Sequence, residues 1–169
     1  MTLSVSVQFA SAAKPLPLRA QVRRWALAAH RDGDGEVTIR YVDEKEGRTL
    51  NRDFRGKDYA TNVLTFLHEA SPLHPKVAPN YSADIVICAP VIAREAREQK
   101  KPVAVHHAHM VLHGMLHAQG FDHENDTDAA AMEAIEIALL RRFRIKNPYE
   151  IECCVFISFS LNARLHRVY

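Results

Sequence analysis

The feature that most constrains this chain is a run of histidines, His113-Gly-Met-Leu-His117-Ala-Gln-Gly120-Phe-Asp-His123. Helix residues four apart share a face with Cβ atoms roughly 5–6 Å apart, so His113 and His117 can reach one ion at about 2.0–2.1 Å, the zinc–nitrogen distance. Gly120 can adopt the left-handed conformation that ends a helix and lets the chain fold back. His123 can then supply a third ligand, which leaves open the fourth position of a catalytic zinc.

A second set of ligands is conceivable along the same predicted helix, namely His109, His113 and His117. The outer two are eight residues apart, about 12 Å along a helix axis at 1.5 Å per residue. Three imidazoles spread that far along a straight helix cannot converge on one ion, so the sequence favours the set that includes His123. We expect the remaining histidines of this helix to be exposed or to support the ligands; these are His106, His107 and His109.

The spacing of the three histidines, with a glycine three residues after the second, equals that of the metzincin proteases. Those enzymes carry a glutamate general base directly after the first histidine, where this chain has Gly114. A peptidase would therefore lack its base, although a metal ion can still act as a Lewis acid and acidify water. Asp122 or Glu124 is expected either to orient a ligand histidine or to be an ordinary solvated residue of the turn.

Length and composition are those of one soluble domain. The 169 residues suit a single sizeable core, and the net charge of +2 with neutral histidines does not announce nucleic-acid binding. Three cysteines, two of them adjacent, form no secreted disulfide framework and favour a reducing compartment. The chain starts without a signal-peptide pattern, and no apolar run approaches the roughly 18 residues that span a bilayer. We therefore expect a cytoplasmic protein with no membrane contact.

Strand and helix patterns alternate, which predicts two or three layers around one small sheet. Apolar runs predict strands at about 3–9, 36–42, 63–67 and 85–88. Apolar stripes and capping residues predict helices at about 18–30, 43–53, 90–100, 102–119 and 126–143. Asp43 is expected to cap the second helix, and Asp126 or Thr127 the last. Residues 150–169 form an atypical apolar C-terminal extension of a domain at 1–149, either an added strand or a poorly ordered segment.

Read as His113-Gly-x-Leu-His117-x-x-Gly120-Phe-Asp-His123, the histidine run resembles the signature of the YbeY family, bacterial metal-dependent endoribonucleases. Further stretches resemble other blocks of that family: Leu50-Asn51, Phe54-Arg-Gly-Lys-Asp58, Thr61-Asn-Val-Leu-Thr-Phe66, Asp84-Ile-Val-Ile87, and Met132 with Glu133 or Glu136. The resemblance covers roughly residues 3 to 149. Asn62 stands where the family commonly has aspartate; an asparagine can form hydrogen bonds but cannot be a base.

The resemblance implies a single α+β domain, in which a small four- or five-stranded mixed sheet packs with helices and the metal site lies on a helix and the following turn. It implies one Zn²⁺ per chain, held by His113, His117 and His123. The implied activity is single-strand-specific endonucleolytic cleavage of RNA, in 16S rRNA 3′-end maturation and ribosome quality control. The implied partners are the small-subunit rRNA precursor and the ribosome, and no DNA is expected.

Arg55 matches the family's important arginine. A guanidinium can hold a phosphate through two hydrogen bonds and offset the charge of a transition state. We therefore expect Arg55, His113 and His117 to be catalytic, and Lys57 to be a weaker phosphate contact. Two other functions stay open: a ribosome-assembly factor that mainly binds and has a largely structural metal site, and a metallopeptidase, which Gly114 disfavours.

Overall fold

The structure is a computed structural model of the chain and describes residues 2–68, 81–121 and 125–149. The strands of these ranges are β1 (Leu3–Phe9), β2 (Gly35–Val42), β3 (Val63–His68) and β4 (Tyr81–Cys88). The helices are α1 (Arg19–Ala29), α2 (Glu44–Arg55), α3 (Ala89–Glu98), α4 (Val103–Ala118) and α5 (Asp126–Arg142). Each predicted strand and helix is found within a few residues of its expected bounds, and the α+β fold is confirmed.

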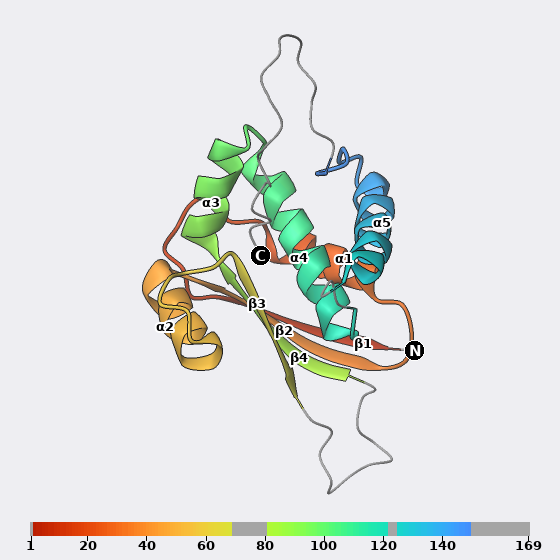
Figure 1. Cartoon of the computed structure of the whole chain (residues 1–169), viewed down its shortest axis with the longest axis horizontal. Helices are drawn as coiled ribbons and strands as arrows, with labels where there is room; N and C mark the ends of the chain where they lie inside the picture. Colours follow the sequence, from red (N-terminus) through yellow and green to blue (C-terminus); the bar gives the residue numbers. More distant parts are fainter. Residues whose placement is uncertain (1, 69–80, 122–124, 150–169) are drawn as a thin grey trace, which may run out of the picture.

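The strands of the described ranges form one mixed sheet in the order β1-β2-β4-β3 (Figure 1). Strands β1, β2 and β4 are parallel, whereas β3 runs antiparallel to β4 along one edge. Strand β4 begins at Tyr81, four residues earlier than predicted. Its first half carries no continuous apolar run, but it pairs with β2 from the Gly35–Tyr81 pair onward. Backbone pairing therefore extends this strand where its side chains gave no signal.

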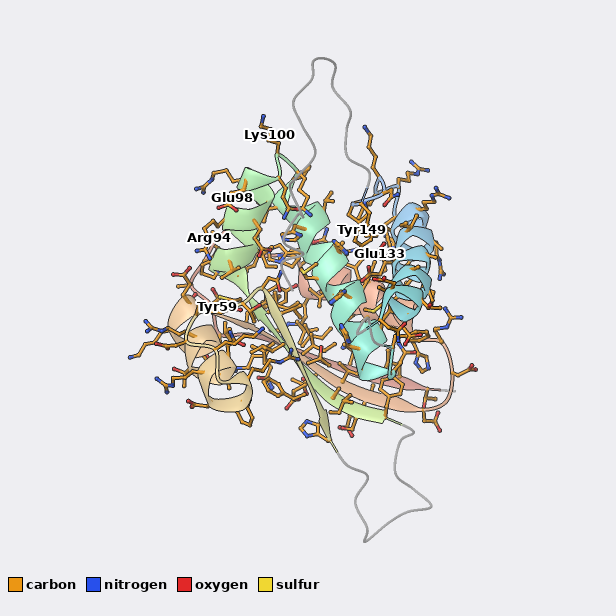
Figure 2. The ribbon with its side chains drawn as sticks, in the orientation of Figure 1. Tyr59, Arg94, Glu98, Lys100, Glu133 and Tyr149 are labelled. Carbon is orange, nitrogen blue, oxygen red and sulfur yellow. The ribbon has the colours of Figure 1, made fainter. Side chains whose placement is uncertain are left out.

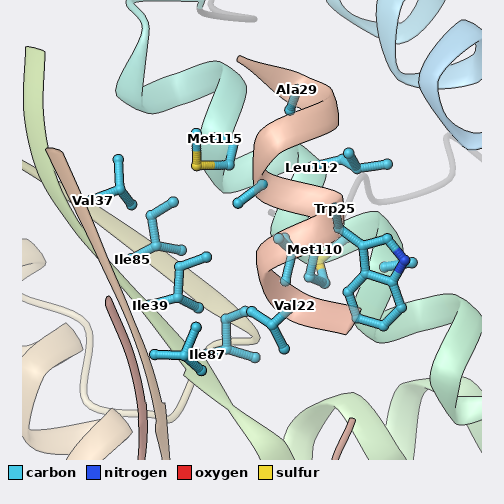
Figure 3. Packing of buried hydrophobic residues seen from close by; sticks show 14 of the residues in the cluster. Val22, Trp25, Ala29, Val37, Ile39, Ile85, Ile87, Met110, Leu112 and Met115 are labelled. Carbon is cyan, nitrogen blue, oxygen red and sulfur yellow. The ribbon is translucent and has the colours of Figure 1, made fainter. Parts of the chain in front are cut away.

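One face of the sheet carries the main core, beneath α1 and α4 (Figure 3). The buried side chains that meet there include Val22, Val37, Ile39, Ile85, Ile87, Leu112 and Met115. A smaller cluster on the other face contains Val86 and Cys88, against which Leu50 of α2 packs. Successive strand residues point to opposite faces, which is why Ile85 and Val86 belong to different clusters. Helices α4 and α2 therefore cover opposite faces of the sheet.

Helix α4 is buried on nearly all sides, because it contacts α1, α3 and α5 as well as β3 and β4. Its histidines share that burial: His106 is 3% exposed, His107 1% and His109 7%. The alternative that these three side chains are exposed is therefore wrong. Polar residues on a central helix cannot be told from surface residues by their spacing, since the helix has no polar face to compare them with.

The predicted helix caps are partly correct. Asp43 does precede α2, but its carboxylate accepts hydrogen bonds from Ser11 and from the Ala12 N–H rather than from its own helix. The cap of α5 is Asn125, one residue before the predicted position, and its side chain accepts from the Asp128 N–H at 2.9 Å. None of the helices in the described ranges is long and apolar enough to cross a bilayer.

Candidate metal centre

Helix α4 is followed by a glycine in the left-handed conformation, as the sequence predicted. Gly120 has φ +86°, in the left-handed region that favours glycine. Its N–H donates to the His117 carbonyl at 3.0 Å, and the Phe121 N–H reaches back to the Leu116 carbonyl at 3.1 Å. These two bonds close the helix and turn the chain away from its axis. The predicted third ligand, His123, lies outside the described residues, as do Asp122 and Glu124.

His113 and His117 face one another on the last two turns of α4. Their Nε2 atoms are 3.1 Å apart, and their ring centroids are 4.6 Å apart. Two nitrogens at tetrahedral positions about 2.0–2.1 Å from a zinc ion are separated by about 3.3 Å. The spacing of the two Nε2 atoms therefore fits a shared metal ion. Within the described ranges no third metal-ligating side chain completes a cluster with them.

A buried carboxylate contacts His113 at the ring nitrogen that does not face His117. Oε1 of Glu136, on α5, lies 2.7 Å from Nδ1 of His113. Its Oε2 accepts from the Tyr149 hydroxyl and lies 3.6 Å from Nε2 of His109. Figure 2 shows Tyr149 between α4 and α5. Glu136 is only 1% exposed, and its contacts with His113 and His109 link α5 to α4.

The charge of Glu136 determines which ring nitrogen of His113 donates to it. Burial alone would raise the pKa of Glu136, but the nearby imidazole of His109 and the hydrogen bond from His113 hold this pKa well below its ordinary value. An ionised carboxylate only accepts hydrogen bonds, so Nδ1 of His113 donates to it, and in a neutral imidazole Nε2 is then the nitrogen that can bind a metal. This is the carboxylate–histidine arrangement that orients imidazole ligands toward a metal.

The sequence did not predict that Glu136 orients His113. It suggested Asp122 or Glu124 for that task. The two partners are 23 residues apart and lie on different helices, so no local spacing links them. One signal was present: Glu136 is midway between Met132 and Leu140, which are both fully buried on the core-facing stripe of α5. A lone carboxylate on such a stripe requires a buried partner.

Gly114 faces the sheet and not the histidine pair. A Cβ atom at this position would lie 2.7 Å from Cγ2 of Ile85 and 3.5 Å from Oγ1 of Thr65. Helix α4 can approach β3 and β4 this closely only because residue 114 has no side chain. A glutamate at this position would collide with Ile85, so the packing of α4 on the sheet leaves no room for the general base that metzincins carry there.

Arg55 is the exposed last residue of α2, which covers the face of the sheet opposite to α4. Within the described ranges neither Arg55 nor Lys57 forms an ion pair. The neighbouring arginines are neutralised by acids: Arg48 by Asp58 at 2.7 Å and Arg52 by Asp53 at 2.9 Å. Free positive charge at this end of α2 therefore comes from Arg55 and Lys57.

Two large aromatic side chains accompany these cations. Phe54 is 68% exposed and Tyr59 51% exposed, and Figure 2 shows Tyr59 beside α2. Phe54 packs edge-on against Phe66 of β3, with ring centroids 5.1 Å apart. Exposed rings interleaved with free cations are typical of surfaces that bind single-stranded nucleic acid.

A second buried polar cluster occupies the opposite end of α4. The Asn62 side-chain amide donates to both oxygens of Glu95 at 3.2–3.3 Å, and Nε2 of His106 lies 2.6 Å from the same carboxylate. Burial opposes the charge of Glu95, yet these hydrogen bonds lower its pKa, whereas burial lowers the pKa of His106. Asn62 therefore serves as a hydrogen-bond donor that joins β3 to α3.

Comparison with known proteins places these features in a family. The family model described as Endoribonuclease YbeY matches residues 12–144. A protein of Thiobacillus denitrificans named endoribonuclease YbeY is 52% identical over 147 residues, which cover 87% of this chain and 96% of that protein. A namesake from Aromatoleum aromaticum is 54% identical over 133 residues, or 79% of this chain and 81% of the relative. A solution structure from Thermotoga maritima, 19% identical, has the same fold with a TM-score of 0.50 and covers 90% of this chain and 99% of its own.

Proposed function

This chain belongs to the YbeY family of endoribonucleases, and from that premise we propose that it cleaves single-stranded RNA with one zinc ion bound by His113, His117 and His123. The observation that carries the proposal is the pair of Nε2 atoms 3.1 Å apart, with His113 held from behind by Glu136. Two histidines of an i, i+4 pair can bind one metal ion, and the hydrogen bond to Glu136 orients the first of them. When bound, zinc would supply a Lewis acid for the phosphoryl group and acidify a water molecule.

The chain's own residues bind and orient the RNA in this proposal. Arg55 offers a planar guanidinium free to contact a phosphate and to offset negative charge as the phosphodiester is hydrolysed. Phe54 and Tyr59 offer ring faces on which unpaired bases stack, which favours single strands over duplexes. Because β3 is an edge strand, an RNA chain crossing it passes from the Arg55 side of the sheet to the histidine pair.

We further propose that the natural substrate is the 3′ end of the 16S rRNA precursor, and that the protein also acts in ribosome quality control. These roles follow from the family resemblance of the histidine and Arg55 blocks. The partners would be the small-subunit precursor and the ribosome, and the compartment would be the cytoplasm. The direct test is the length of 16S rRNA 3′ ends in cells whose only copy carries His117→Ala; extended ends are expected, and mature ends would contradict the role.

The reaction itself is tested on purified protein with metal analysis beside RNA cleavage. His117→Ala should lose zinc and cleavage together, whereas His68→Ala should keep its zinc, because His68 is an exposed residue of β3 paired with Asp84. Wild-type protein should cut a single-stranded RNA and spare the same sequence in a duplex. Full cleavage by metal-free His117→Ala would refute the proposal. RNA association that survives Arg55→Ala and metal removal, without cleavage, would indicate the binding-only assembly factor instead.

A further inference from the structure

A pocket of about 460 Å³ lies on the side of the molecule formed by α1, the first turn of α4 and the end of α5. Its apolar part includes Trp25 and Phe143, and its charged part is formed by Arg24, Arg142 and Arg144. Figure 3 shows the indole of Trp25 at the edge of the buried cluster, with its nitrogen directed away from the sheet. The volume is that of a small-ligand site, and the lining combines aromatic rings with several cationic groups.

The positive charge of this pocket is not neutralised. Arg24, Arg142 and Arg144 are exposed and form no ion pair with any carboxylate of the described ranges. Arg24 lies over the ring of Phe143 at 5.3 Å from its centroid, and Arg142 donates to the Ala28 carbonyl at 3.3 Å. These contacts orient two guanidinium groups without offsetting their charge. An anion is therefore the ligand that the pocket favours.

The backbone of Arg144 adds an independent observation. This residue follows the end of α5 with φ +59°, where the Ile145 N–H bonds back to the Leu140 carbonyl at 3.1 Å. Glycine is the favoured residue at such a position, because a side chain is strained there. Lys100 follows the end of α3 in the same left-handed conformation, and cations near a helix C-terminus offset its dipole; the end of α5 differs in that a pocket lies beside its cation.

The pocket is separated from the histidine pair but lies along the same helices. Val105 of α4 lines the pocket, eight residues before His113, or about 12 Å along the helix axis. Helix α5 carries both Glu136, behind His113, and Arg142, at the pocket. The pocket and the histidine pair are therefore built on the same two helices.

We propose that this pocket binds one nucleotide of an RNA strand at a distance from the cleaved bond. The three guanidinium groups hold the phosphate, and the base packs on Phe143 and the accessible edge of Trp25. This inference rests on the proposed RNA substrate. It adds a second binding site, so that the protein contacts a longer stretch of the RNA strand. RNA too short to span both points would be cleaved without using the pocket.

The chain provides its own probe, because Trp25 is its one tryptophan. Trp25 emission is measured in a stopped-flow instrument, before cleavage, while zinc-loaded full-length protein is titrated with a uridine-rich single-stranded RNA of ten nucleotides. We expect a saturable change. Arg142→Ala should raise the midpoint about tenfold, the effect of one lost charge-assisted hydrogen bond, and flatten the salt dependence. The charge-matched control is Arg97→Ala, an exposed α3 arginine outside the pocket, which should leave the midpoint unchanged.

Arg144→Gly separates binding from folding. Glycine relieves the strained backbone, so this variant should melt no lower than wild type, yet it should bind the ten-nucleotide RNA about tenfold more weakly. The proposal that the pocket binds RNA would be refuted if Arg142→Ala and Arg144→Gly left the binding midpoint unchanged. It would also be refuted if Arg97→Ala weakened binding equally. Cleavage of a trinucleotide is measured in parallel and should be unaffected by the pocket variants. If wild type cleaved no RNA, the proposed function would fail, while the Trp25 titration would still decide the pocket.

Discussion

Replacing Gly114 with alanine is expected to destabilise the protein, although alanine is the better helix former. The new Cβ would lie 2.7 Å from Cγ2 of Ile85. That separation is about 0.7 Å shorter than an ordinary carbon–carbon contact. Ile85 is fully buried on β4, which is paired on both sides, so neither partner can move freely. The substitution therefore forces α4 and the sheet apart.

The size of the effect follows from two opposing contributions. Gly→Ala inside a helix gains about 0.8–1.0 kcal/mol of unfolding free energy. Overpacking a tight core costs about 1–3 kcal/mol, and the rigid surroundings of Ile85 place this case at the upper end. The net loss for Gly114→Ala is then about 2 kcal/mol. Because α4 carries His113 and His117, the same displacement should weaken zinc binding.

The assay is urea unfolding followed by Trp25 emission and by circular dichroism, combined in a double-mutant cycle. Ile85→Leu removes the branch at Cβ and with it the clashing Cγ2 atom, whereas Ile85→Val keeps that atom. In the Gly114→Ala background, Ile85→Leu should therefore restore about 1–2 kcal/mol, and Ile85→Val should restore none. Stabilisation by Gly114→Ala alone, or equal rescue by Leu and Val, would refute the reasoning that Gly114 is required for close approach.

Four further outcomes are expected. Glu136→Gln should weaken zinc binding about 10–100-fold in competition with a chelator, because the ligand histidine loses its anionic partner; unchanged affinity would contradict the role of that carboxylate. Arg55→Ala should lower the rate of RNA cleavage about tenfold or more at constant zinc content, whereas Arg52→Ala, already paired with an acid, should not; equal losses would point to general charge. Phe54→Ala should weaken single-stranded RNA binding by about 1–3 kcal/mol in a filter assay without lowering the melting temperature, and no change would exclude stacking. Burial lowers the pKa of His107 to about 4, so below pH 6.5 this residue binds more protons in the unfolded chain than in the folded one. Its contribution to the unfolding free energy should fall by about 3 kcal/mol between pH 7 and 4, measured as the difference in pH dependence between wild type and His107→Leu; identical pH dependence of the two proteins would contradict it.

The sequence predicted those parts of the fold that depend on local periodicity. Alternation from Leu3 to Phe9 defined β1, and the i, i+4 spacing with Gly120 placed His113 and His117 together at the end of a helix. Both features follow from geometry within one element, because the helix repeat and the left-handed preference of glycine act over a few residues.

Features that depend on contacts between elements were not predictable in this way. The histidines His106 and His107 are polar, yet they are buried because α4 lies between helices and the sheet. Glu136 joins the metal centre from another helix, and only the packing of α5 on α4 brings it there. Tyr81 starts β4 by pairing with Gly35 of a distant strand. In each case tertiary packing, and not propensity, decides the outcome.

The hydrogen bonds of Glu136 connect His113 to parts of the chain that are synthesised later. The chain emerges from its N-terminus, so the strands and α4 are made before α5. Glu136 comes 23 residues after His113, and Tyr149, which holds the other carboxylate oxygen, comes later still. A nascent chain therefore contains His113 and His117 well before it contains Glu136. The full set of hydrogen bonds to Glu136 forms only when Tyr149 has been added.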